Sequence, residues 1–277
     1  MSVIIHGIIL GMVLGMMGMS AYSLSKYLGM VEDDNNCKEC ERYESCFAKQ
    51  TYWNGRFVWL DEFMLVSFLK VRHQCRYYQK ESMKWRIVYL SFSCILMTVL
   101  FWSKGISGAT YILCVATAML LMLSVVDWNT EFIPMECNIG IFLCGLMQLF
   151  ADFSNWVEYA IGLIAVSGFL LLVNWVATPI LRKKYEGERE IDQVVGYGDI
   201  KLMAATGLLL GWKLNFLALG LGCVIGSIIH ITLMRIKGSD KQFALGPYLS
   251  LGVFITMICG EQLISWYLNV MGVVPMN

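Results

Sequence analysis

The residues best able to do chemistry are two aspartates that stand at the ends of apolar stretches. Asp199 follows the turn Gly196-Tyr197-Gly198 and opens a mostly apolar run. Asp127 closes another apolar run, and Pro134 follows it after a short polar segment. A carboxylate at the mouth of a membrane helix is costly to desolvate and so indicates a functional site. The alternative is an interfacial helix cap, a position that Asp commonly takes.

Two carboxyl groups held close together cannot both ionise easily, so they share a proton. One of them can then deprotonate a water while the other protonates the scissile carbonyl or the leaving amine of a peptide bond. This peptidase chemistry needs no metal. Gly196 and Gly198 are expected to let the connecting loop bend so that Asp199 approaches Asp127, because glycine adopts conformations that other residues avoid.

The composition excludes an ordinary soluble domain. Of 277 residues, 57% are hydrophobic and 15% are charged, which predicts a polytopic protein of the lipid bilayer. The net charge of zero gives no sign of a nucleic-acid partner. We expect an all-α bundle of about eight transmembrane helices. The predicted spans are 3–24, 86–103, 107–126, 135–151, 156–178, 200–212, 214–234 and 244–270. The sixth is short, and is therefore tilted, extended by its flanks or packed inside the bundle.

The distribution of basic residues predicts the orientation. All but Lys104 and Lys213 of the 21 Lys and Arg residues fall in three connecting segments, 25–86, 179–201 and 235–243. An excess of Lys and Arg marks the cytoplasmic side, so both termini are expected outside. The third span then ends on the cytoplasmic side beside Asp127, and the sixth begins on that side beside Asp199. The two aspartates are therefore predicted at one face and one depth.

Small residues recur at helical spacing in two of the spans. Gly7, Gly11 and Gly15 follow one another every four residues in the first span, and Gly222 and Gly226 do so in the seventh. Small residues at this spacing allow helices to approach closely, so we expect helix packing here and no ligand site.

Three motifs together resemble the type IV prepilin peptidases. They are Asp127 with Ile133-Pro134, the segment Gly196-Tyr197-Gly198-Asp199-Ile200-Lys201-Leu202, and Ala244-Leu245-Gly246-Pro247-Tyr248-Leu249-Ser250-Leu251-Gly252. The last is similar to the family's FGPYLALG segment, and the resemblance covers residues 107–252. The family's Ile-Pro pair is usually followed by Asp, whereas Met135 and Glu136 follow here. That departure does not involve the two motif aspartates.

Presenilin-like proteases also carry a GxGD motif. In those proteins a tyrosine precedes the first aspartate and a Pro-Ala-Leu segment follows. Here Val126 precedes Asp127 and no Pro-Ala-Leu occurs, so this relationship is set aside.

The resemblance implies an aspartic endopeptidase of the bacterial inner membrane with Asp127 and Asp199 as its catalytic dyad. Its substrate would be a type IV prepilin or pseudopilin, cut after a glycine at the cytoplasmic face. The expected domains are a first transmembrane helix at 1–24, a cytoplasmic loop domain at 25–85 and a membrane-embedded peptidase domain at 86–277. The motif residues expected to support the dyad are Gly196, Gly198, Lys201, Pro134, Gly246 and Pro247.

Four cysteines fall in the predicted cytoplasmic loop, where stable disulfides are not expected. Cys37, Cys40, Cys46 and Cys75 offer the four thiolates of a closed tetrahedral zinc site. Unliganded reduced thiols are the alternative. Many prepilin peptidases carry two CxxC pairs in this loop, but Tyr78 stands here where the last cysteine would fall.

Family members often also methylate the newly exposed N-terminus with S-adenosylmethionine. For this chain that activity rests on the resemblance alone, and the altered cysteine pattern departs from it. Two other classes of function remain open. A proton- or ion-coupled transporter would bind its ion at intramembrane carboxylates. A secretion-system membrane subunit without catalytic activity is the other. The sequence leaves open which prepilin is cut and the oligomeric state.

Overall fold

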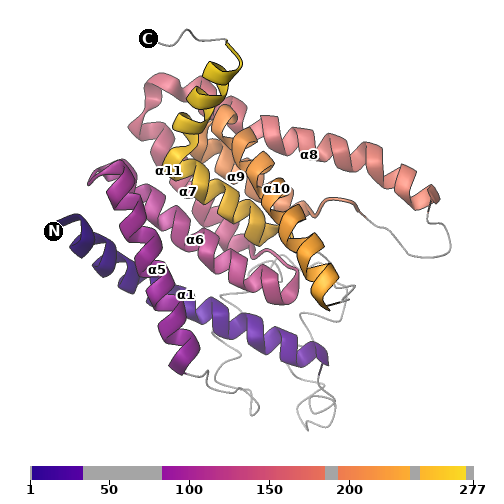
Figure 1. Cartoon of the computed structure of the whole chain (residues 1–277), viewed down its shortest axis with the longest axis horizontal. Helices are drawn as coiled ribbons and strands as arrows, with labels where there is room; N and C mark the ends of the chain where they lie inside the picture. Colours follow the sequence, from indigo (N-terminus) through magenta and orange to yellow (C-terminus); the bar gives the residue numbers. More distant parts are fainter. Residues whose placement is uncertain (1, 34–82, 185–192, 238–243, 273–277) are drawn as a thin grey trace.

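The computed structural model describes residues 2–33, 83–184, 193–237 and 244–272. Within these ranges all regular structure is helical. The helices, labelled as in Figure 1, are α1 (Ser2–Asp33), α5 (Met83–Lys104), α6 (Gly108–Thr130), α7 (Met135–Ala151), η1 (Phe153–Asn155), α8 (Trp156–Lys184), α9 (Tyr197–Leu210), α10 (Trp212–Lys237) and α11 (Gly246–Val270).

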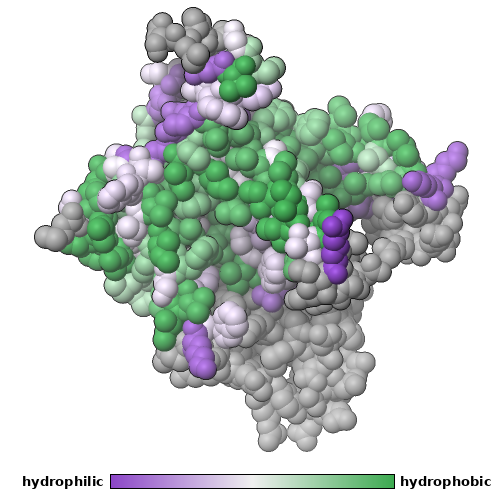
Figure 2. Space-filling model, viewed as in Figure 1, coloured by the Kyte–Doolittle hydropathy of each residue, from purple (hydrophilic) through white to green (hydrophobic). Residues whose placement is uncertain are grey.

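Six helices of the described ranges are long and apolar enough to cross a membrane, and α7 is a shorter apolar helix. The prediction of an all-α polytopic membrane protein is confirmed. Large apolar side chains remain exposed on the outside of the bundle, Trp102 and Trp175 among the most exposed at 77% and 82%. Figure 2 shows that much of the described surface on this face is hydrophobic, and lipid would cover it.

The short sixth span is helix α9, and it is packed inside the bundle. Eight of its 14 residues are buried, and it contacts α7, α8, α10 and α11. Gly162 of α8 and Gly207 of α9 lie backbone against backbone, because a Cβ on either would overlap the carbonyl oxygen of the other. The turn to α10 is the single residue Gly211, whose φ of 79° favours glycine.

The glycines of the first span pack as predicted. A Cβ at Gly7 would lie 2.6 Å from the Cα of Thr98, and one at Gly11 would lie 2.5 Å from the Cα of Cys94. Both partners belong to α5, which runs beside α1 (Figure 1). Gly222 likewise allows close approach of α11, since a Cβ at this position would lie 3.0 Å from the Cα of Leu249. The spacing of small residues therefore predicted helix contacts correctly.

Two helices continue past their predicted ends, α1 to Asp33 and α8 to Lys184. Backbone hydrogen bonding does not need apolar side chains, so a helix need not stop where the hydrophobic run stops. Arg182, Lys183 and Lys184 occupy the last turn of α8, where positive charge stabilises the helix dipole.

Candidate active site

Asp127 lies in the last turn of α6 and is only 4% exposed. Its Oδ2 accepts a hydrogen bond of 3.0 Å from the backbone N–H of Gly246, the first residue of α11. The backbone N–H of Glu131, which has a φ of 54°, closes the helix on the carbonyl oxygen of Asp127 at 2.8 Å. A negative charge at a helix C-terminus opposes the dipole. A buried acid at this place is thus poorly explained as a simple cap.

Asp199 lies in the first turn of α9, where a negative charge favours the helix dipole. The side chain is half-buried, and its Oδ1 is buried with no hydrogen-bond partner among the described residues. Gly196 precedes the helix as its N-cap, and its carbonyl oxygen accepts a hydrogen bond of 3.2 Å from the N–H of Ile200. One carboxylate oxygen of Asp199 therefore remains available for chemistry.

The fold brings the two aspartates to the same end of the bundle, around the side chain of Ile133. A Cβ at Gly246 would lie 2.6 Å from Asp127 Oδ2 and 3.4 Å from Ile133 Cδ1. A Cβ at Gly198 would lie 3.0 Å from Ile133 Cβ. Helices α7 and α11 each contact both α6 and α9, so they hold the two acids in place.

The expected reason for the two motif glycines is wrong. Gly196 has a φ of −60°, and neither Gly196 nor Gly198 has a positive φ, so other residues could adopt both backbones. The glycines act instead through the space that a missing side chain leaves. A Cβ at Gly196 would lie 3.0 Å from Asp199 Oδ2, and one at Gly198 would press on Ile133. They permit close approach, and they do not bend the loop.

This geometry predicts the effect of a larger residue at Gly198. In Gly198→Val the side chain would push α9 away from Ile133 and shift Asp199, so we expect kcat/KM for peptide cleavage to fall about tenfold or more. The thermal unfolding midpoint should move by only a few degrees. Gly220→Val is the matched control, since a Cβ there meets nothing within 4 Å. Equal cleavage by the two variants would contradict the role of this contact.

The other motif residues take different places. Pro134 is the buried N-cap of α7, where its missing N–H leaves no helix hydrogen bond unmade. Pro247 lies at the start of α11 for the same reason. Lys201 is exposed, and its Nζ lies 4.0 Å from the Sδ of Met135. It therefore lies against the start of α7.

Asn138, Ser250 and Asn174 are three of the buried polar side chains that were given no role from the sequence. Asn138 of α7 is 4% exposed, and both of its amide atoms lack a partner among the described residues. Ser250 of α11 is 5% exposed, and its Oγ also lacks one. Both lie one turn beyond a motif residue, Pro134 or Gly246, at the end of the bundle that carries the aspartates. The third is Asn174 of α8, which is hydrogen-bonded. The signal that could have found them is a polar residue within an apolar run.

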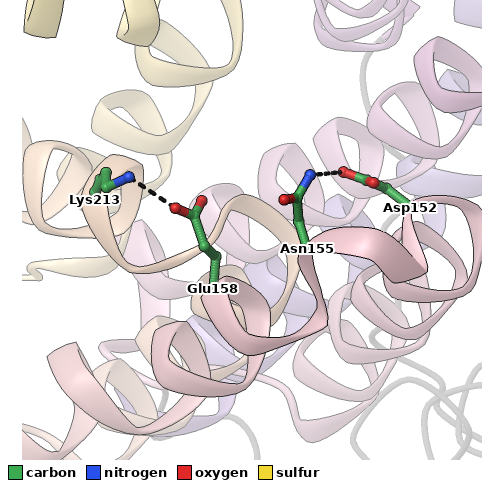
Figure 3. A network of polar contacts seen from close by, with 4 residues as sticks. All are labelled: Asp152, Asn155, Glu158 and Lys213. Carbon is green, nitrogen blue, oxygen red and sulfur yellow. Dashed lines mark hydrogen bonds and ion pairs between the residues drawn. The ribbon is translucent and has the colours of Figure 1, made fainter.

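A pocket of about 440 Å³ lies at the opposite end of the helices, where α7 ends and α8 begins. Its rim carries an ion pair of 2.7 Å between Lys213 and Glu158 and a hydrogen bond of 2.9 Å from Asn155 to Asp152 (Figure 3). Lys104 and Lys213, the two lysines predicted on the side away from the aspartates, both line it. The pocket is thus separate from the two motif aspartates.

Cys37, Cys40, Cys46 and Cys75 lie outside the described residues, as does most of the predicted loop domain at 25–85. Among the residues that are described, no group of three or more His, Cys, Asp or Glu side chains could hold a metal ion. The zinc site therefore remains a prediction from the sequence.

Comparison with known proteins gives one consistent result. Residues 114–231, which include both motif aspartates, match the family described as type IV leader peptidase. A prepilin leader peptidase/N-methyltransferase of Pseudomonas putida is 27% identical over 84% of this chain and 80% of its own. Proteins of the same name from Aeromonas hydrophila and Pseudomonas aeruginosa are 28% and 26% identical, over 76% and 75% of this chain and 70% of theirs.

No solved structure shows significant similarity to the chain. The family match and the curated relatives agree with the motifs and with the helical membrane fold. Over residues 114–231 the chain is thus similar to the type IV leader peptidase family, and over about three quarters or more of its length it is similar to prepilin leader peptidases/N-methyltransferases.

Proposed function

We propose that this protein is a membrane aspartic endopeptidase that removes the leader peptide of type IV prepilins or pseudopilins, with Asp127 and Asp199 as the catalytic dyad. The observation that carries the proposal is the convergence of two carboxyl groups from α6 and α9 around Ile133 and Gly246. Relatives of the chain are named prepilin leader peptidase/N-methyltransferase, which supports this substrate class.

The surroundings of the two acids suggest their roles. The N–H of Gly246 donates to Asp127 and favours its ionised form, so Asp127 is the better base. Asp199, whose Oδ1 has no hydrogen-bond partner among the described residues, would carry the shared proton. Asp127 would take a proton from a water whose oxygen attacks the scissile carbonyl carbon, while Asp199 protonates the carbonyl oxygen. When the C–N bond breaks, the proton held by Asp127 passes to the leaving amine. As the C=O bond forms again, one hydroxyl of the gem-diol returns its proton to Asp199.

We place the dyad at the cytoplasmic face of the bacterial inner membrane. The support is the distribution of Lys and Arg, of which only Lys104 and Lys213 lie on the other side. A prepilin whose basic leader stays in the cytoplasm would present its cleavage site at the same face. The leader is removed after a glycine that precedes the apolar helix of the substrate.

The test is cleavage of a co-expressed prepilin by the wild-type chain in a host without its own peptidase. Mass spectrometry of the product should show an N-terminus directly after the glycine. The competing transporter hypothesis predicts instead that cargo accumulates with an ion gradient and that the prepilin stays intact. A secretion-system subunit without catalytic activity predicts neither result. Intact prepilin across several substrates would reject the proposed function.

Methylation of the new N-terminus is the second part of the proposal, since the relatives are named N-methyltransferases as well. S-adenosylmethionine would be the methyl donor. The mass of the cleaved N-terminus, measured in the same experiment, reveals the methyl group directly.

We further propose that Cys37, Cys40, Cys46 and Cys75 bind a structural zinc ion. Purified protein should then contain about one zinc per chain, and the double variant Cys37→Ser with Cys40→Ser should lose it. Metal analysis of the two proteins checks this. The control is Cys223→Ser, which changes an exposed thiol of α10. Metal-free wild-type protein would favour unliganded thiols.

A further inference from the structure

Asn174 is a buried amide in the apolar helix α8, 7% exposed. Its Oδ1 accepts hydrogen bonds from the backbone N–H groups of Val194 and Val195, at 2.9 and 3.3 Å, and from the Thr178 hydroxyl at 3.0 Å. A buried polar group costs free energy unless it is hydrogen-bonded, and these three donors supply that compensation. Two of the three donors belong to a segment 20 and 21 residues further along the chain.

That segment leads directly into the helix of Asp199. Val195 is bonded to Gly196, the N-cap of α9, and Asp199 follows in the first turn. The space at Gly196 is occupied by Asp199 itself, because a Cβ there would lie 3.0 Å from Asp199 Oδ2. A shift of Val194 and Val195 would therefore move the start of α9 and its first carboxylate.

We propose that Asn174 is a positioning residue for the dyad. Its hydrogen bonds hold the segment before α9 against helix α8. They thereby keep Asp199 at the distance from Asp127 that proton sharing requires. Asn174 acts through the backbone of Val194 and Val195 and has no contact with the reacting atoms. The catalytic consequence rests on the proposed peptidase function, whereas the fastening of the segment does not.

The expected effects follow from this geometry. Asn174→Leu keeps a side chain of similar size and removes the acceptor. A misplacement of about 1 Å can cost roughly 100-fold in rate, so kcat should fall by about that factor while KM stays within about threefold. Amide hydrogens that lose a hydrogen bond exchange faster, so those of Val194 and Val195 should exchange at least about tenfold faster than in the wild type. Thr178→Val removes only the hydroxyl donor and should preserve amide protection.

The experiment combines hydrogen exchange with cleavage kinetics on the purified full-length protein. Ser167→Ala is the matched control, since among the described residues this buried hydroxyl of α8 donates only to the carbonyl oxygens of Leu163 and Ile164 in its own helix. The proposal is supported if Asn174→Leu alone shows both faster amide exchange at Val194 and Val195 and a lower kcat. It is overturned if those amides exchange freely in the wild type, or if Asn174→Leu behaves like Ser167→Ala.

A second variant covers the case in which Asn174→Leu does not fold. Asn174→Asp keeps an acceptor oxygen at the same place and should keep the two amides protected; fast exchange there would contradict the proposal. Failure of the wild type to cut any prepilin would reject the peptidase function. The exchange data would still decide whether Asn174 fastens the segment, so the two failures are distinguishable.

Discussion

Asp127→Asn and Asp199→Asn are each expected to abolish prepilin cleavage, with a loss of about 1,000-fold or more. Each substitution removes a group that takes or gives a proton, and neither carboxyl group can replace the other. The fold should persist, because in Asp127→Asn the amide oxygen of the new side chain can still accept from the N–H of Gly246. The measurement is the cleaved fraction of a co-expressed prepilin over time, with equal amounts of enzyme.

The control for this prediction is Asp152→Asn at the opposite end of the bundle. Asp152 accepts hydrogen bonds from Asn155 and Tyr159, at 2.9 and 3.2 Å, and takes no part in the proposed chemistry. This variant should cleave at close to the wild-type rate. Cleavage by both dyad variants at that rate would show that the catalytic residues lie elsewhere. Loss in only one of them would leave a single-carboxylate mechanism.

Gly246→Ala is expected to lower kcat/KM by about 100-fold. The added methyl group would lie 2.6 Å from Asp127 Oδ2 and 3.1 Å from its Cγ, inside van der Waals contact. The carboxylate must then move away from the backbone N–H of residue 246, and the hydrogen bond that holds it in place is weakened or broken. Steady-state kinetics on a purified prepilin should show the loss mainly in kcat, because the change is at the reacting groups.

Gly108→Ala is the matched control for this substitution. Gly108 is the first residue of α6 as Gly246 is of α11, and a Cβ there meets nothing within 4 Å. Both proteins should accumulate in the membrane to similar levels. If Gly246→Ala cleaves as fast as Gly108→Ala, the hydrogen bond from Gly246 does not position Asp127.

The helices and the two aspartates could be predicted from the sequence because each leaves a local signal. An apolar run long enough to cross the bilayer is visible residue by residue, and the two aspartates mark the ends of such runs. The roles of the motif glycines near the two aspartates could not be predicted. Gly246 donates its backbone N–H to Asp127 from 119 positions further along the chain, and a backbone donor has no sequence signature.

Gly198 and Asn174 illustrate the same limit. The sequence presents Gly198 as a residue of unusual flexibility, whereas the fold uses the space beside Ile133 that its missing side chain leaves. Asn174 is recognisable as a polar residue in an apolar helix, but its partners at Val194 and Val195 depend on how α8 and α9 pack. Tertiary contacts decide both cases.

The length of α9 has a consequence for how the scissile bond of a substrate is selected. A helix of 14 residues is about 21 Å long, shorter than the roughly 30 Å of hydrocarbon in a bilayer. Its far end is tied to α10 through Gly211, while α8 and α10 both run on past its near end (Figure 1). Asp199, in the first turn of α9, thus lies deeper in the bundle than the neighbouring ends of α8 and α10. The peptide bond that is cut would then be selected by how deeply the substrate inserts between these helices, as well as by the residues next to that bond.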